Sequence, residues 1–150
     1  MAHERGALLG HGMDDEAVDE FLTEQGVGVL SLAADDEPYG LPISFGYDGE
    51  RCYFLFAGHS TEGRKVRFAE AASEASFLAF DVAGEAEWRS AVVRGPLERI
   101  DYDGWEAARE AMLDNAYRPD LLVDVDVASD PRVWALDVAE RSGRRMPPGD

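Results

Sequence analysis

The sequence is poor in positive charge and almost free of lysine. Its 150 residues include 14 Lys and Arg against 31 Asp and Glu, for a formal net charge of -17, and Lys65 is the only lysine. Nucleic acids and anionic lipid surfaces are bound largely through Lys and Arg side chains that neutralise phosphate groups. We therefore expect neither a nucleic-acid partner nor a membrane partner.

The excess of acid also predicts the conditions in which the chain works. A compact state with this charge repels itself unless salt screens it, and the Debye length falls to about 3 Å at molar ionic strength. The composition resembles that of haloarchaeal proteins and predicts a halophilic protein, although an acidic interaction module would have the same totals. The acids are interleaved with apolar residues along the chain, which favours a solvated coat over a disordered tail.

Cysteine is scarce and long apolar runs are missing. Cys52 is the only cysteine, so no internal disulfide can form, and its place in a strand pattern favours a core residue over a nucleophile. No apolar stretch approaches the ~20 residues of a membrane span, and the N-terminus lacks the apolar core of a signal peptide. We expect a cytoplasmic protein.

Hydrophobic patterning predicts one mainly β domain at residues 13–141, between a flexible lead-in at 1–12 and a loose tail at 142–150. Five or six strands with short helices, and apolar residues on both strand faces, indicate a small closed or partly closed barrel, because closure removes exposed strand edges. Asp48-Gly49 predicts a hairpin. The expected strands are 27–33, 39–47, 51–57, 75–82, 87–100 and 132–138, and the expected helices are 14–26, 63–72 and 104–116.

The strand expected at 39–47 has one face without bulk. Gly40, Pro42, Ser44 and Gly46 alternate there with large side chains, and such a face lets a flat molecule approach the backbone. Tight packing of another strand or helix explains it equally well. Pro42 lacks an N-H, which confines it to a sheet edge or a non-bonded position. Free main-chain groups at an edge could hydrogen-bond the polar rim of a planar ring.

A candidate phosphate site follows the strand expected at 51–57. A helix N-terminus offers free N-H groups, and hydroxyls and cations add to them; the candidates are Ser60, Thr61, Gly63, Arg64 and Lys65. An ordinary capped helix with a solvated basic turn is the simpler alternative. Three basic residues within four positions of so acidic a chain favour the phosphate hypothesis. The triphosphate-binding pattern Gly-x-x-x-x-Gly-Lys-Ser/Thr is absent.

The longest expected strand begins with a third candidate group. Trp88 fits a core or interface position, which is the common fate of tryptophan. Arg89 and Ser90 could reach a ligand or a partner subunit.

Three segments, in this order, resemble the FMN-binding split β-barrels of the pyridoxamine phosphate oxidase-like family: Leu-Pro-Ile-Ser-Phe-Gly-Tyr-Asp-Gly at 41–49, Tyr-Phe-Leu-Phe-Ala-Gly-His-Ser-Thr-Glu-Gly-Arg-Lys at 53–65, and Trp-Arg-Ser-Ala-Val-Val-Arg-Gly at 88–95. The resemblance is strongest to the branch that includes nitroimidazole-resistance-type reductases. It implies a six-stranded antiparallel split β-barrel. The arginine that true pyridoxamine phosphate oxidases carry on the second barrel strand is missing, which argues against vitamin B6 oxidation.

The resemblance also implies a homodimer with FMN at the subunit interface. Ser60, Thr61, Arg64 and Lys65 would then hold the phosphate, with Gly63 permitting close approach. The flavin ring would be lined by backbone atoms of Ile43, Ser44 and Phe45, while Phe56 and Ala57 would follow the ribityl chain and ring. Trp88, Arg89 and Ser90 would approach the flavin from a neighbouring strand or subunit. FAD, a deazaflavin or heme could replace FMN in related barrels.

The expected function is that of an FMN-dependent oxidoreductase acting on a small molecule that the sequence does not identify. A flavin carrier or redox sensor without turnover is one alternative, because fold does not imply activity, and an acidic interaction module without cofactor is another. No catalytic dyad, triad or metal cluster is evident. His59 is the one histidine near the proposed site, either as a proton donor or as a loop residue with local hydrogen bonds.

Overall fold

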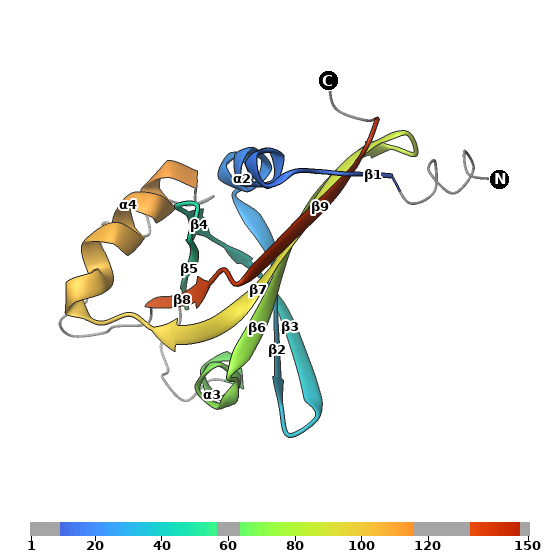
Figure 1. The fold of residues 1–150 in the computed structure, drawn as a ribbon. Coiled ribbons are helices and arrows are strands. Elements are labelled where there is room, and N and C mark those ends of the chain that lie inside the picture. The colour runs from blue at the N-terminus through green and yellow to red at the C-terminus, as the bar shows by residue number, and fades with distance from the viewer. Residues whose placement is uncertain (1–9, 57–63, 116–132, 148–150) are drawn as a thin grey trace.

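The computed structural model describes residues 10–56, 64–115 and 133–147, without the side chains of 64–66, 102 and 115. Its strands are all antiparallel and form two leaves that share one long strand (Figure 1). The helices in these ranges are short: α2 (Asp15–Glu24), α3 (Arg64–Ala71) and α4 (Trp105–Asn115), with a 3-10 turn, η1 (Tyr102–Gly104), before α4.

The larger leaf has the strand order β3-β2-β6-β7-β9-β1. Its centre is the long hairpin of β6 and β7, which pair from Glu74↔Pro96 to Gly84↔Glu87. The bounds of its strands are β1 (His11–Gly12), β2 (Val27–Ala34), β3 (Glu37–Ser44), β6 (Glu74–Gly84), β7 (Glu87–Arg99) and β9 (Glu140–Met146).

The smaller leaf continues from the end of β7, where Leu97 to Arg99 pair with β8. It has the order β7-β8-β5-β4, formed by β4 (Gly46–Tyr47), β5 (Arg51–Leu55) and β8 (Val133–Asp137). The chain crosses between the leaves at Phe45, because β3 ends at Ser44 and pairs with β2, whereas β4 pairs with β5. The predicted single strand at 39–47 is therefore wrong: it is two strands in two leaves.

The predicted tail and lead-in also need correction. Residues 140–146 form β9, which pairs with β7 from Trp88↔Met146 to Arg94↔Glu140, so most of the segment expected to be a loose tail is part of the sheet. His11 and Gly12, expected in a flexible lead-in, pair with β9. The described residues thus contain nine strands in place of six, and the antiparallel split-barrel fold class is confirmed.

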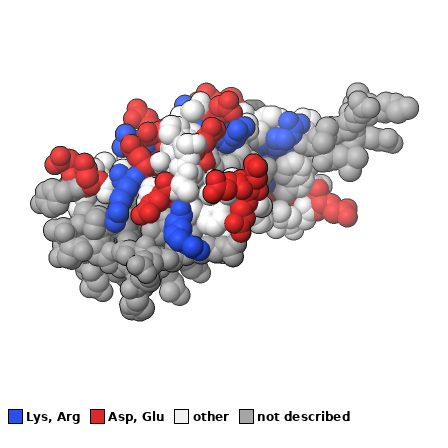
Figure 2. All heavy atoms as spheres, turned by 90° about the horizontal axis from the view of Figure 1, so that it is seen from below, with Lys and Arg blue, Asp and Glu red and all other residues white. Residues whose placement is uncertain are grey.

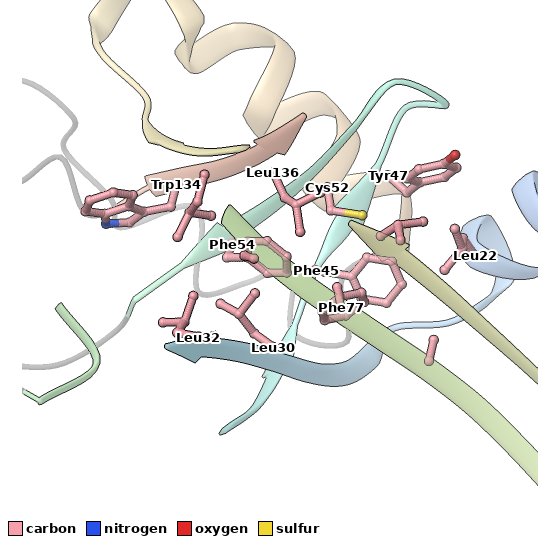
Figure 3. Close-up of a cluster of buried hydrophobic side chains, with 14 of the residues drawn as sticks. Leu22, Leu30, Leu32, Phe45, Tyr47, Cys52, Phe54, Phe77, Trp134 and Leu136 are labelled. Carbon is pink, nitrogen blue, oxygen red and sulfur yellow. The ribbon is translucent and has the colours of Figure 1, made fainter. Parts of the chain in front are cut away.

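The core lies between the two leaves (Figure 3). Phe77 of β6 meets Phe45 and Phe54 with ring centroids 4.6 and 5.1 Å apart, and all three side chains are fully buried. Cys52 is buried beside them, as predicted, and burial raises the pKa of its thiol. A second apolar cluster beneath α4 joins Met112 to Tyr53 of β5.

Local sequence signals explain two of the predicted boundaries. Asp14 caps α2, since its Oδ1 accepts a hydrogen bond of 2.8 Å from the backbone N-H of Ala17. The Asp48-Gly49 turn is present, with Gly49 at φ +95° and the Asp48 carboxylate accepting from the N-H groups of Glu50 and Arg51. Within the described ranges, no helix is long and apolar enough to cross a bilayer.

Candidate functional site

One face of the larger leaf carries the buried core, whereas side chains on the other face are half-buried or exposed in the described part of the chain. Cross-strand register places Val29, Leu78, Val92 and Ser142 on the same outer side, because directly paired residues share a face. Large apolar side chains are exposed at one end of this outer face: Val27 is 42 % exposed, Phe80 54 % and Val82 65 %. So exposed an apolar strip is unusual for a surface that faces only water.

A pocket of about 430 Å³ opens on this outer face. The pairing of β2 with β6 ends at Val29↔Leu78, so beyond that point β6 continues with β7 alone while β2 turns towards α2 (Figure 1). The pocket forms where the two strands diverge. Residues 25–29, Pro42 and Phe80 line it.

The candidate ring-binding strand lies beside this pocket. β3 pairs with β2 on one side, and no strand of the described ranges pairs with its other side. Pro42 is exposed on this edge strand, as its missing N-H predicts. Ser44 and Ile43 pair with Val27 and Gly28, so both lie at the pocket's border.

The bare face predicted for 39–47 divides into two parts. At Gly40 nothing lies nearer than 3.9 Å to the place of a Cβ, so the backbone there is open to approach. At Gly46 a Cβ would overlap the backbone of Ala111 and Met112 in α4. Tight helix packing explains Gly46, and only the part at Gly40 and Pro42 is available to a ligand.

Two of the predicted ring-lining and ribityl-lining residues point their side chains into the core. Phe45 is 0 % and Phe56 1 % exposed, and the Phe56 ring stacks on Trp134 with centroids 6.0 Å apart. Only their backbone atoms could therefore meet a ligand, which is the role predicted for Phe45.

The three candidates at the start of β7 do not come together. Trp88 and Ser90 pair with Val82 and Phe80, so they lie on the outer face with the pocket. Arg89 lies on the inner side, where its guanidinium is 4.7 Å from the centre of the Phe21 ring and forms ion pairs of 3.2 Å with Glu24 and 3.4 Å with Asp81.

The predicted phosphate segment lies mostly outside the described residues. This holds for Ala57, Ser60, Thr61 and Gly63, and for His59. The backbone of Arg64 and Lys65 forms the first turn of α3, close to the predicted helix start. Phe68 of the same helix stacks on Tyr39 of β3 with ring centroids 5.0 Å apart, which fixes α3 beside the candidate strand.

A polar cluster stands away from the pocket, where α2, the β4–β5 turn and β9 meet. The Tyr47 hydroxyl donates a hydrogen bond of 2.5 Å to Asp19 Oδ1, and the Arg141 guanidinium donates to the same oxygen at 2.7 Å. Burial and then the Asp19 carboxylate raise the pKa of Tyr47. The cluster joins three elements, and none of its residues lines the pocket. No group of three potential metal ligands occurs in the described part of the chain.

Sequence reasoning missed Val27 and Phe80, the large apolar side chains at the pocket that are 42 % and 54 % exposed. A signal for them exists. Residues 77–80, Phe-Leu-Ala-Phe, are apolar at every position, and a strand with two apolar faces indicates that both faces are covered in the working molecule.

The two leaves, the crossing at Phe45 and the shared strand β7 define a split β-barrel. The chain belongs to the pyridoxamine 5'-phosphate oxidase family, whose profile matches residues 14–145. A curated relative, an uncharacterised protein of Rhizobium meliloti, is 28 % identical over 71 residues; the match spans 47 % of this chain and 44 % of that protein.

Solved structures share the fold at low sequence identity. A FAD-binding protein from Mesorhizobium loti is 23 % identical with a TM-score of 0.70, covering 91 % of this chain and 97 % of that one. A FAD and heme binding protein from Mycobacterium smegmatis is 20 % identical (TM-score 0.68; 93 % and 76 % covered). A putative 5-nitroimidazole antibiotic resistance protein from Bacteroides thetaiotaomicron is 16 % identical (TM-score 0.68; 91 % and 88 % covered).

Proposed function

We propose that this protein binds FMN and is an FMN-dependent oxidoreductase. The single observation that carries the proposal is the open edge of β3 beside an apolar pocket, in a chain whose family and structural neighbours include flavin-binding proteins. A bound flavin would supply hydride and electron transfer, and the protein would supply binding and orientation.

The described residues fit such a group. Gly40 and Pro42 leave room along β3, and the backbone at Ile43 and Ser44 would hold the ring's polar rim. The start of α3 would hold the phosphate through Arg64 and Lys65, with Ser60, Thr61 and Gly63 before it. These assignments of Arg64, Lys65 and the preceding loop rest on the sequence.

We further propose a homodimer. An exposed strip that includes Val27, Phe80 and Val82 supports it, because such a strip is stabilised by covering it with a like surface. Trp88 and Ser90 lie on the same face. In such a dimer the Trp88 and Ser90 side chains of one copy would approach the flavin of the other.

The absorption spectrum tests the cofactor, and dialysis against FMN or FAD tests which flavin is held. FMN binding at a higher affinity than FAD is expected. Oxidation of NADH or NADPH by the loaded protein with an electron acceptor tests turnover. A protein that binds flavin and turns over neither nucleotide would favour a carrier or sensor.

A further inference from the structure

The Trp88 indole reaches across a neighbouring strand to the edge of the larger leaf. Trp88 belongs to β7, which pairs with β9, and β1 pairs with the other side of β9 (Figure 1). Gly10 directly precedes β1, yet a Cβ built on Gly10 would meet the ring of Trp88. Adjacent strands lie about 4.8 Å apart, so the indole must lie along the sheet to span β9 and reach Gly10.

We propose that Gly10 is a positioning residue, which fixes the Trp88 indole in this orientation on the outer face and thereby favours flavin binding. The effect on flavin binding rests on the proposed function, in which Trp88 approaches the flavin. The effect on the indole rests on packing alone.

Two independent features favour glycine at position 10. The φ angle of Gly10 is +73°, in the left-handed region where a side chain is strained. A Cβ there would also overlap Cη2 of the Trp88 ring, and it would lie 2.9 Å from Cζ2 and 3.0 Å from the carbonyl oxygen of Arg145. The indole therefore occupies the space that the side chain of any other residue would need.

The backbone at Gly10 is held in place from two directions. The two residues of β1 that follow it pair with Arg145 and Arg144 of β9. The Arg144 side chain also donates a hydrogen bond of 3.1 Å from Nη2 to the Gly10 carbonyl oxygen. Gly10 is buried and Trp88 is half-buried. The support under the ring is thus part of the sheet, although the sequence placed Gly10 in a flexible lead-in.

A fixed indole affects binding through conformational entropy. A tryptophan side chain has several staggered rotamers, and contact with Gly10 selects one of them before any ligand arrives. A pre-organised side chain loses less freedom when it meets a ligand. Disturbing Gly10 should therefore weaken flavin binding, and it should do so only while Trp88 is present.

Fluorine NMR of protein labelled with 5-fluorotryptophan tests the orientation in the absence of flavin. The chain has three tryptophans, and Trp88→Leu identifies the Trp88 resonance by its loss. Gly10→Ala should shift that resonance by more than its linewidth and leave the other two in place. If Gly10→Ala does not fold, Gly10→Asn replaces it, because asparagine tolerates the left-handed region and still places a Cβ against the ring.

Two other glycines provide matched controls. Gly12→Ala adds a methyl group within β1, and Gly49→Ala adds one at φ +95°, in each case with nothing within 4 Å of the Cβ. Gly12→Ala controls for the added methyl group and Gly49→Ala for the backbone strain, so neither should move the Trp88 resonance. A Trp88 resonance that stays in place in the Gly10 variant, or that moves as far in either control, would overturn the proposal.

A double-mutant cycle tests the connection to flavin. Gly10→Ala should lower FMN affinity about fivefold, within the range of couplings between residues in contact, and should have no effect in the Trp88→Leu background. Equal losses in both backgrounds, or no loss in either, would overturn the role in flavin binding. A chain that binds no flavin would remove the proposed function, whereas the fluorine spectra of the flavin-free protein would still decide whether Gly10 positions Trp88.

Discussion

Trp88 and Arg89 are consecutive in β7, and their side chains leave opposite faces of the larger leaf. Trp88 shares the outer face with Val82 and the pocket, whereas Arg89 packs over Phe21 and pairs with Glu24 on the side of α2. Their neighbouring positions in the sequence gave both the same predicted role. Successive residues of a strand point to opposite faces of the sheet, so the two side chains have different roles.

Single substitutions of Arg89 and Trp88 should affect different properties, with Arg89 contributing to stability and Trp88 to flavin affinity. Arg89→Met removes two partly exposed ion pairs and a cation–π contact. The free energy of unfolding, measured by urea denaturation, should therefore fall by about 1 kcal/mol. Flavin affinity should change by less than twofold. Trp88→Leu should reduce the free energy of flavin binding more than it reduces the free energy of unfolding. A tenfold loss of flavin affinity in Arg89→Met with unchanged stability would return Arg89 to the site.

Lys65 is expected to contribute to flavin phosphate binding. Lys65→Ala should weaken FMN affinity by about 1 to 3 kcal/mol, the scale of a charge-assisted hydrogen bond, in a fluorescence titration at working salt. Arg67→Ala is the control, because Arg67 is an exposed cation of the same helix, outside the predicted cradle. If both changes lower FMN affinity equally, the loss comes from the change in net charge and not from a specific contact of Lys65.

Gly40 and Gly46 should behave differently when a methyl group is added. Gly46→Ala forces β4 against the backbone of α4 and should destabilise the protein by at least ~2 kcal/mol, as overpacking does. Gly40→Ala meets nothing within 3.9 Å and should keep full stability. If the flavin ring approaches β3 there, Gly40→Ala should still lower flavin affinity. An unchanged affinity would show that the ring does not lie against Gly40.

These contrasts show where sequence patterns sufficed. Alternation, the Asp14 cap and the Asp48-Gly49 turn are local, and they predicted the helices and most strands correctly. β9 was missed because Glu140–Met146 carries arginine and serine in place of an apolar face, and its strand state comes from pairing with β7. The break at Phe45 was missed because which leaf a residue joins is decided by tertiary packing.

The same limit applied to the candidate site. Pro42 identified an edge strand correctly, because the missing N-H is a property of the residue itself. The pocket arises where β2 parts from β6, and no local pattern specifies that divergence. The two-sided apolar run at Phe80 was the available hint.

Stability should fall at alkaline pH through two buried tyrosines. Burial and then the hydrogen bond to Asp48 raise the pKa of Tyr53 from 10.0 to about 12, and burial and Asp19 raise that of Tyr47. A raised folded pKa means that the stabilisation is complete below pH 10 and is lost as pH rises through 12. Urea unfolding at stepped pH should show this loss.

The double variant Tyr47→Phe, Tyr53→Phe provides the comparison for that pH profile. It should be less stable at pH 8 because it lacks both hydrogen bonds. Its stability should change less above pH 10, since the two hydroxyls whose pKa is raised in the folded state are gone. Parallel profiles for the two proteins would contradict the assignment.

Salt should stabilise the protein. A net charge of -17 opposes compaction, and Figure 2 shows acidic side chains among basic ones on the face of the molecule seen from below. We expect the melting temperature to rise steadily from 0.1 to 2 M KCl. Choline chloride at equal ionic strength controls for specific ion binding, and a melting temperature independent of both salts would remove the halophilic interpretation.

Whether this split barrel holds a flavin can be read from the absorption spectrum of the purified protein after dialysis against FMN. We expect flavin bands that stay with the protein, with maxima shifted from those of free FMN, at about one flavin per chain. FMN at the same concentration on both sides of the dialysis membrane, with the spectrum of free FMN, would show that the protein binds none.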